Sequence, residues 1–271
     1  GLEAACTAAE VGCNTFLLEK SNELGGLASL ISKIPAKNRL ADFPHYLMHR
    51  AEQLDNLYIF KNTEGTPENI RKFHPNIIVS STGSAPLLPP IAGLKDRIDN
   101  ENHNIYSILG MISHINDFPK DLEGKKVVVV GGGAVGLDVV EFFADRNADI
   151  SIVEMMDQIG RDLDPVSKND TKTMMKKHNV HQLTKTALLE VKDSSFLVRG
   201  DGEPYELPFE YGFVCLGMRA QGQLYQNLTE EFSSEDVEIM NIGDSQRARR
   251  IIDGTQEGRN ILTVLEQKGY L

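Results

Sequence analysis

The sequence is poor in the residues that support thiol and metal chemistry. It contains three cysteines and no tryptophan in 271 residues. Cys6, Cys13 and Cys215 form no C-x-x-C pair and match no metal-site spacing, so we expect neither a redox disulfide nor a bound metal. An iron–sulfur cluster within the chain would also need more cysteines. All three are interpreted as small hydrophobic residues of a core.

Long apolar runs and clusters of positive charge are also missing. No stretch is apolar for long enough to cross a bilayer, and no secretion signal is visible, so we expect a cytoplasmic protein. Lys and Arg number 28 against 39 Asp and Glu, which gives a net charge of −11. The basic cluster is "RARR" at Arg247–Arg250. Neither a membrane nor a nucleic acid is therefore an expected partner, and the oligomeric state is left open.

The chain is rich instead in glycine placed directly after apolar runs. Its length and its 41% hydrophobic content suit two domains of ordinary size. In "KKVVVVGGGAVG" a run of valines precedes Gly131, Gly133 and Gly136 in G-x-G-x-x-G spacing, the dinucleotide-binding fingerprint. The glycines allow a tight turn, a close approach to a pyrophosphate, and close packing of the helix on the strand. Ala134 and Val135 open that helix and are included in the predicted site. The alternative is a purely structural turn.

An acidic residue closes the strand that follows this helix. Glu154 ends the run "ISIVE" and is predicted to accept hydrogen bonds from a ribose hydroxyl. The alternative is a solvated acid at a strand end. The residues after it are Met155, Met156 and Asp157, and the next basic residue is Arg161. Since no positive charge stands ready for a 2′-phosphate, the sequence favours NADH over NADPH.

The opening of the chain repeats this pattern. The first twenty residues, "GLEAACTAAEVGCNTFLLEK", align without a gap with "GLDVVEFFADRNADISIVEM". Gly1 falls opposite Gly136, and Glu19 falls opposite Glu154. We therefore predict that Gly1 is the third glycine of another fingerprint and that Glu19 is a second ribose ligand. The first strand of that fingerprint would lie upstream, so we expect the natural protein to continue before Gly1. The alternative is that Gly1 begins an unrelated helix.

The repeat continues to the end of each unit. Thr82 and Gly83 end the last strand of the first unit, and Leu216 and Gly217 end that of the second, at nearly the same spacing from the aligned glycines. Two units of similar span predict two related nucleotide-binding domains. Thr82, Gly83 and Gly217 would let the backbone pass close to a cofactor; a plain turn is the alternative.

The remaining segments complete the expected secondary structure. After residue 234 a strand ends at Gly243-Asp244 and a helix follows; this tail has no counterpart in the second unit, so we expect it to complete the first. Helices are predicted to begin at Thr66 and near Asp164, and Pro44 is expected to interrupt another. "HQLTKTALLEVKD", "SSFLVRGDG" and "EPYELPFE" are predicted to be antiparallel strands.

These pieces together resemble the two-dinucleotide-binding flavoproteins. Within them the chain looks most like the C-terminal half of the 2,4-dienoyl-CoA reductase, trimethylamine dehydrogenase and enoate reductase group of NADH:flavin oxidoreductases. The matching motifs follow the family order along nearly the whole chain: "GLEAA…LLEK", "ELGG", "TPENI", "STGSAP", "KKVVVVGGGAVG", "VEMMDQIGRDLDP", "LGMR" and "IGDSQRARRIIDGTQEGRN".

The resemblance implies an α/β fold of two Rossmann-like domains, one inserted in the other. A discontinuous FAD-binding (or ADP-binding) domain, 1–104 and 235–271, would lack its first strand and enclose an NAD(H)-binding domain, 105–234. The resemblance also implies an N-terminal barrel, outside this chain, that holds FMN and a 4Fe-4S cluster. Electrons would pass from NADH to FAD and onward to that barrel, which reduces an unsaturated substrate. The alternatives are a non-catalytic ADP-binding module and a free-standing NADH-dependent ferredoxin or quinone reductase.

The resemblance also adds cofactor-binding residues to those found from the repeat. It implies that Asp244 lies near the ribityl and phosphate part of FAD, although Asp244 has the alternative role of N-cap for the final helix. The further positions that it adds are Lys20, Gly25, Gly26 and Gly243. Hydride transfer is chemistry of the cofactors themselves, so no catalytic acid or base is named.

Overall fold

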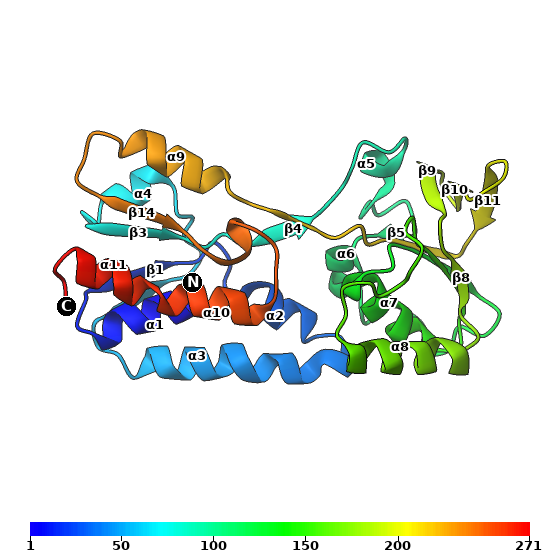
Figure 1. Cartoon of the computed structure of the whole chain (residues 1–271), viewed down its shortest axis with the longest axis horizontal. Coiled ribbons are helices and arrows are strands. Elements are labelled where there is room, and N and C mark those ends of the chain that lie inside the picture. Colours follow the sequence, from blue (N-terminus) through cyan, green and yellow to red (C-terminus); the bar gives the residue numbers. More distant parts are fainter. The chain divides into compact units, whose positions relative to one another are not determined.

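The computed structural model describes all residues from 1 to 271, which divide into two compact units (Figure 1). Unit 1 comprises Gly1–Ser32, Lys37–Ala85 and Met218–Leu271, and unit 2 comprises Lys33–Ala36 and Pro86–Gly217. The expected division after 104 and 234 differs from this one, because 86–104 group with unit 2 and 218–234 with unit 1. Both units are α/β with parallel strands, which confirms the predicted fold class.

Unit 1 contains two separate pairs of parallel strands. β1 (Thr15–Leu18) pairs with β2 (Leu57–Phe60), and β3 (Ile77–Ser80) pairs with β14 (Glu238–Asn241). The tail of the chain therefore returns to the first unit, as the repeat predicts. The helical segments of this region are α1 (Leu2–Glu10), α2 (Gly26–Ile31), η1 (Pro35–Ala41), α3 (Asp42–Glu52), α4 (Pro67–Arg71), α9 (Gln223–Glu231), η2 (Gly243–Ser245), α10 (Ile251–Arg259) and α11 (Ile261–Gln267).

Helix α1 packs against both strand pairs of unit 1. Its residues Ala5 and Ala9 cluster with Leu57 of β2, while Ala8 clusters with Ile261 of α11 and with β3. The small side chains of α1 allow this close packing on two neighbours. The opposite face of the β3–β14 pair is covered by α9, whose buried Leu228 belongs to a third cluster.

Unit 2 is built on a parallel sheet in the order β5-β12-β6-β7-β8. The valines of β6 are buried on both faces of this sheet, which explains the uninterrupted apolar run. Phe142 and Phe143 of α7 cover one face, and Phe196 of an antiparallel sheet, β11-β10-β9, covers the other. The strands are β5 (Ile105–Tyr106), β6 (Lys126–Val130), β7 (Asp149–Val153), β8 (His181–Leu183), β9 (Ala187–Val191), β10 (Ser195–Arg199), β11 (Tyr205–Pro208) and β12 (Tyr211–Val214). The helices are α5 (Leu94–Arg97), α6 (Ile108–Ser113), α7 (Ala134–Ala144) and α8 (Pro165–Lys177).

The local predictions were confirmed in three places and wrong in two. Helix α4 is capped by Thr66, and α8 is capped by Asp164; the antiparallel pairing of β9, β10 and β11 is also seen. His181–Leu183, however, pairs in parallel with β7, because helix α8 carries the chain back to the starting edge of the sheet. Pro44 does not interrupt a helix: it is the third residue of α3, where a backbone N–H has no partner within the helix to lose.

Two short strands lie where the chain leaves unit 1 after Ala85 and returns to it at Met218. These strands, β4 (Ser84–Pro86) and β13 (Met218–Ala220), pair with each other.

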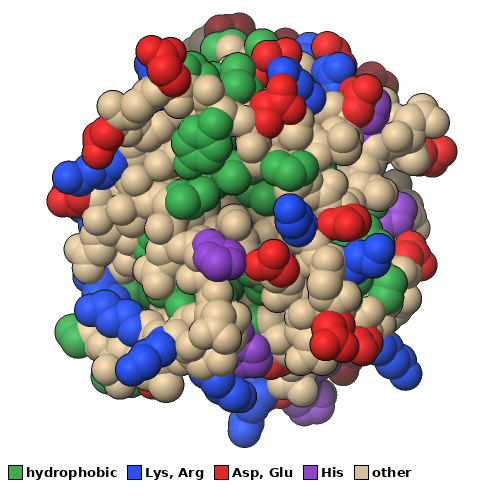
Figure 2. All heavy atoms as spheres, turned by 90° about the vertical axis from the view of Figure 1, so that its right-hand side faces the viewer, with side chains coloured by type: hydrophobic (Ala, Val, Ile, Leu, Met, Phe, Trp, Pro, Cys, Tyr) green, Lys and Arg blue, Asp and Glu red, His purple; other side chains and the backbone are tan.

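None of the helices is both long and apolar enough to span a bilayer. On the face drawn in Figure 2, acidic and basic side chains are interspersed rather than sorted by sign.

Candidate nucleotide-binding sites

The first two fingerprint glycines of unit 2, Gly131 and Gly133, lie in the turn between β6 and α7, and the third, Gly136, lies in the first turn of α7. Gly131 has a φ of +109°, and a Cβ there would lie 2.1 Å from the carbonyl oxygen of Cys215. A Cβ at Gly136 would lie 1.9 Å from the carbonyl oxygen of Gly131, whereas one at Gly133 would meet nothing within 4 Å. Packing therefore requires the first and third glycines. The second faces open space, as a close approach by a pyrophosphate needs.

The start of α7 offers backbone donors at the same place. The helix begins at Ala134 and Val135, and no side chain caps it at Gly133. The first N–H groups of a helix have no intrahelical acceptor, and the helix dipole makes this end favourable for an anion. The fingerprint turn and the first turn of α7 together fit a dinucleotide phosphate.

Glu154 lies directly beside this turn. One carboxylate oxygen accepts a hydrogen bond from the backbone nitrogen of Gly132 at 2.6 Å, and the other accepts one from Met156 at 2.7 Å. The structure therefore brings together the fingerprint and the acid predicted to bind the ribose. A further contact was not predicted: the backbone nitrogen of Gly160 donates to the carbonyl oxygen of Gly132 at 2.7 Å. The "QIG" segment therefore packs on the fingerprint, and no sequence pattern signals this.

Unit 1 repeats parts of this arrangement. Gly1 precedes α1, and a Cβ there would lie 2.7 Å from the hydroxyl of Ser81, which follows β3. Glu19 follows β1 as Glu154 follows β7, and its carboxylate accepts hydrogen bonds from the backbone and hydroxyl of Ser21, both at 2.9 Å. Lys20 comes next and is exposed. Unit 1 therefore contains the later part of the unit 2 arrangement: a glycine, a helix, a strand and an acid follow one another in the same order, beginning at the position of the third glycine.

The other predicted glycines occupy turns. Gly25, with a φ of +100°, is the N-cap of α2, and Gly26, with a φ of +55°, is the first residue of that helix. Gly83 has a φ of +74°, and its carbonyl oxygen accepts a hydrogen bond from the backbone of Gln221; the neighbouring Thr82 hydroxyl donates to the carbonyl oxygen of the same residue. Gly217 has a φ of +97°. Left-handed backbone favours glycine at each of these positions, so they remain candidates for cofactor contact and are turns in any case.

Asp244 is held by two hydrogen bonds within unit 1. One carboxylate oxygen accepts from the hydroxyl of Ser84 at 3.0 Å, and the other accepts from the backbone nitrogen of Arg249 at 3.0 Å. The alternative role as N-cap of the final helix is wrong, because α10 begins at Ile251 and its N-cap is Arg250. Asp244 therefore lies in the 3-10 helix η2, within the loop that leads from β14 to α10.

A further acid, which the sequence reasoning missed, contacts the same loop. Glu257 of α10 accepts a hydrogen bond from the backbone nitrogen of Gly243 at 2.6 Å, and its other oxygen forms an ion pair with Arg249. The hydrogen bond from the Arg249 guanidinium to this carboxylate raises the pKa of Arg249. One carboxylate therefore holds both ends of the loop that carries Asp244.

The three thiols are poor candidates for redox chemistry. All are free, and burial raises the pKa of Cys215 to about 12. Burial also raises the pKa of Cys6 and of Cys13. Because the thiolate is the reactive form, these thiols are unreactive near neutral pH. The structure holds no group of three His, Cys, Asp or Glu side chains arranged to bind a metal ion.

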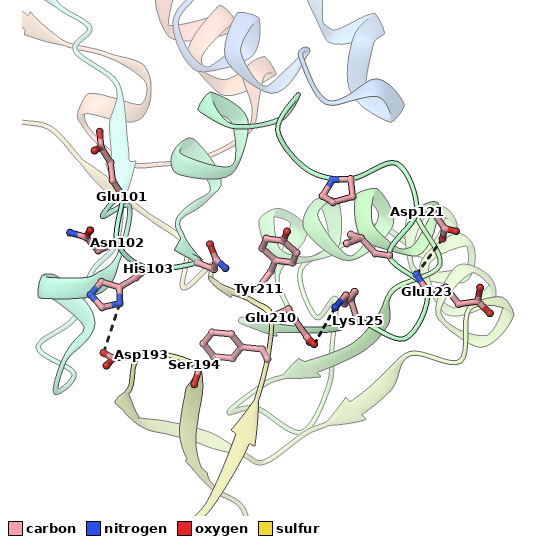
Figure 3. A pocket seen from close by; sticks show the side chains of 14 residues that line it. Glu101, Asn102, His103, Asp121, Glu123, Lys125, Asp193, Ser194, Glu210 and Tyr211 are labelled. Atoms are coloured by element: carbon pink, nitrogen blue, oxygen red, sulfur yellow. Dashed lines mark hydrogen bonds and ion pairs between the residues drawn. The ribbon is translucent and has the colours of Figure 1, made fainter.

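A cavity of about 600 Å³ lies at the other edge of the unit 2 sheet (Figure 3). It is bounded by residues at the starts of β5, β6 and β12, whereas the fingerprint follows the end of β6. Its acidic lining residues are Glu101, Asp121, Glu123, Asp193 and Glu210. Since ligands of such sheets bind at the carboxyl ends of the strands, this cavity is not part of the nucleotide site.

Comparison with known proteins gives relatives that are named as oxidases, reductases and dehydrogenases. The NADH oxidase of Thermoanaerobacter brockii is 26% identical over 259 residues, which covers 95% of this chain and 38% of that protein. A 2-naphthoyl-CoA reductase complex has a TM-score of 0.81 at 23% identity, covering 96% of this chain and 37% of its own. Histamine dehydrogenase from Rhizobium sp. 4-9 also has a TM-score of 0.81, at 16% identity, over 96% of this chain and 39% of its own. The chain spans well under half of each relative.

These comparisons confirm the resemblance that the motifs indicated, and the two structural matches share its fold. Residues 48–240 match the family described as pyridine nucleotide-disulphide oxidoreductase. The matched segment includes the fingerprint turn, Glu154 and both connecting strands. The chain therefore belongs to the pyridine nucleotide-disulphide oxidoreductase family and is a flavin-dependent oxidoreductase module whose cofactors are FAD and a pyridine nucleotide.

Proposed function

We propose that this chain is the electron-input module of a larger flavin-dependent reductase. Unit 2 binds NADH, unit 1 binds FAD, and electrons pass from NADH to FAD. The observation that carries the proposal is the arrangement in unit 2, where the open face of Gly133 and the carboxylate of Glu154 meet at one turn. The partial copy of that arrangement in unit 1 supports a second dinucleotide there.

The residues of the chain bind and orient, and the bound cofactors supply the hydride chemistry. The fingerprint turn and the first turn of α7 hold the pyrophosphate of NADH, and Glu154 accepts hydrogen bonds from the ribose. In unit 1 the start of α1 would hold the pyrophosphate of FAD, Glu19 would accept hydrogen bonds from its ribose, and Asp244 would lie near its ribityl and phosphate part. The thiols are buried or half-buried and remain protonated near neutral pH, so we assign them no part in electron transfer.

Comparison of the two units supports a further segment in unit 1. In unit 2, β6 pairs with β7 on one side and β12 on the other. In unit 1, β1 is the counterpart of β7 and β3 is the counterpart of β12. Each of these two strands has one strand neighbour, and they belong to separate sheets. We propose that a strand outside 1–271 fits between β1 and β3 and carries the first two glycines ahead of Gly1. It would also satisfy the backbone groups along those two edges.

The same proposal includes a partner domain that receives the electrons. A barrel domain carrying FMN and a 4Fe-4S cluster would accept them from FAD and reduce an unsaturated substrate. The relatives are more than twice as long as the segment they share with this chain, so they have room for such a domain. The cinnamate reductase of Clostridium sporogenes, 22% identical over 93% of this chain, is a relative named for an unsaturated substrate.

The decisive test is anaerobic titration of the intact protein with NADH, followed by its visible spectrum. We expect the oxidised-flavin absorption, which NADH bleaches. A colourless protein that binds only ADP would contradict the proposal and identify a structural nucleotide-binding module. A coloured protein that reduces soluble ferredoxin or quinone without any partner domain would identify a free-standing reductase instead.

A second test uses the segment 1–271 alone. We expect it to bind NADH at unit 2 and to bind FAD poorly, because it would lack the two glycines that we place on the proposed upstream strand. Calorimetry with each cofactor distinguishes the two sites. Tight FAD binding by this segment would contradict the proposed upstream strand.

A further inference from the structure

Asp244 lies in a short loop whose two ends are held by one side chain. The loop runs from Gly243, two residues after β14, through the short 3-10 helix η2 to Arg249, just before α10. Glu257, two turns into α10, accepts a hydrogen bond from the Gly243 backbone with one oxygen and pairs with the Arg249 guanidinium through the other. Because both groups are donors and the carboxylate has two acceptor oxygens, this geometry needs a carboxylate at 257.

The orientation of Asp244 depends on that loop. Its carboxylate is fixed on one side by the backbone nitrogen of Arg249 and on the other by the Ser84 hydroxyl. Gly243 takes a φ of +66°, and a Cβ there would lie 3.9 Å from the Cα of Gly254 in α10, so the loop also packs closely on the helix. If Glu257 released either end, the Arg249 backbone N–H would move and Asp244 would lose one of its two fixed donors.

We propose that Glu257 is a positioning residue for the flavin: it sets the conformation of the Gly243–Arg249 loop and thereby aims the Asp244 carboxylate at the cofactor. This inference rests on the proposed binding of FAD by unit 1. Glu257 itself touches the loop and not the cofactor, so its effect passes through Asp244.

The test is a double-mutant cycle on FAD affinity in the intact flavoprotein. Glu257→Ala is expected to weaken FAD binding by at least about tenfold, which is about 1.4 kcal/mol. In an Asp244→Ala background the same change should have less than about a twofold effect, because residues that act through one another are not additive. Glu257→Gln keeps an acceptor for Gly243 but loses the ion pair with Arg249, so its effect should be intermediate.

Two controls separate positioning from general damage. Glu231→Gln removes an ion pair with Arg71 in the same unit, at a more exposed site outside the Gly243–Arg249 loop. It should leave FAD affinity unchanged, and all variants should bind NADH at unit 2 as the wild type does. The partial rescue in the Glu257→Gln variant, measured beside the melting temperature, would also not follow from a loss of stability alone.

The outcomes distinguish this inference from the function on which it rests. A colourless wild-type protein would overturn both. A coloured protein in which the effects of Glu257→Ala and Asp244→Ala multiply, or in which Glu257→Ala matches Glu231→Gln, would overturn the positioning role alone. Strong coupling between the two acids with NADH binding intact would establish it.

Discussion

The carboxylate of Glu154 lies 2.6 Å from the backbone nitrogen of Gly132, inside the fingerprint turn. Under the proposed binding of NADH by unit 2, this acid would meet the ribose beside the turn. Its second oxygen is fixed by the backbone of Met156. A carboxylate held in that position attracts a hydroxyl donor and repels a phosphate. We therefore expect Glu154 to decide the preference between NADH and NADPH.

We expect NADH to be preferred over NADPH by at least about tenfold, about 1.4 kcal/mol. Glu154→Ala should shrink the ratio by losing more affinity for NADH than for NADPH. The measurement is kcat/KM for anaerobic flavin reduction with each nucleotide. Asp157→Asn removes an exposed acid three residues later and should change neither value. Equal or better performance of the wild type with NADPH would show that Glu154 does not bind the ribose.

The second and third fingerprint glycines should respond differently to the same substitution. Gly136→Ala places a Cβ 1.9 Å from the carbonyl oxygen of Gly131 and should lower the free energy of unfolding by about 1–3 kcal/mol. Gly133→Ala meets no atom within 4 Å, so it should fold normally and lose NADH affinity because the methyl group occupies the space of the phosphate.

Thermal unfolding and NADH binding are measured for each glycine variant. Gly202→Ala, at an exposed turn where a Cβ also meets nothing, is the matched control and should leave both quantities unchanged. Wild-type NADH affinity in Gly133→Ala would argue that the pyrophosphate lies elsewhere.

The ion pair between Glu10 and Arg50 should make unit 1 sensitive to acid. The hydrogen bond from Arg50 lowers the pKa of Glu10 below its ordinary value of 4.5. A depressed carboxylate pKa stabilises the fold above the unfolded-state value, and that contribution is lost as the pH falls through the folded-state pKa. Glu10→Gln should therefore destabilise the protein at pH 7, by a modest amount because the pair is partly exposed, and the difference should shrink below about pH 4.5.

Urea unfolding at several pH values checks this expectation. The control is Glu68→Gln, an exposed acid whose amine partner, Lys72, is 4.0 Å away. A Glu10→Gln deficit that is the same at pH 3 and pH 7 would mean that the ionised pair is not its source.

None of the cysteines should be needed for electron transfer. Burial raises the pKa of Cys215 to about 12, and Cys6 is fully buried, so in the native protein a thiol reagent should label Cys13 at most. All three should react after unfolding. Cys13→Ser should keep its rate of flavin reduction by NADH. Loss of that rate would point to a thiol step and away from direct transfer between the cofactors.

The sequence predicted best where one residue type has one physical explanation. Four valines and three spaced glycines encode a strand buried on both faces, a turn and a close helix, and all of these are present around Gly131. The position of Glu154, at the end of the next strand and beside the turn, followed from the same pattern. The strand at His181–Leu183 was predicted to pair antiparallel, because three residues do not indicate whether a strand runs parallel or antiparallel to its neighbour. The pairing is parallel because α8 lies between β7 and this strand and returns the chain along the sheet.

The loop contact of Glu257 was beyond sequence reasoning for another reason. Its partner is the backbone of Gly243, which any residue possesses, so no pairing of side chains along the chain indicates it. The boundary between the units could not be predicted for a related reason. Helix α9 joins unit 1 because Leu228 and Phe232 pack with Ile78 of β3, a contact between distant segments that local patterns do not encode.

The pairing of β3 with β14 joins two strands that are synthesised far apart in time. All but four residues of unit 2, the segment Pro86–Gly217, are synthesised after β3 and before β14. At elongation rates of about 5–20 residues per second, β3 waits roughly 8 to 30 s for its partner, long enough for unit 2 to fold first. During that interval the nascent chain carries an early strand with a bare edge next to a finished domain. An unpaired strand edge of this kind is prone to aggregate until its partner strand is synthesised.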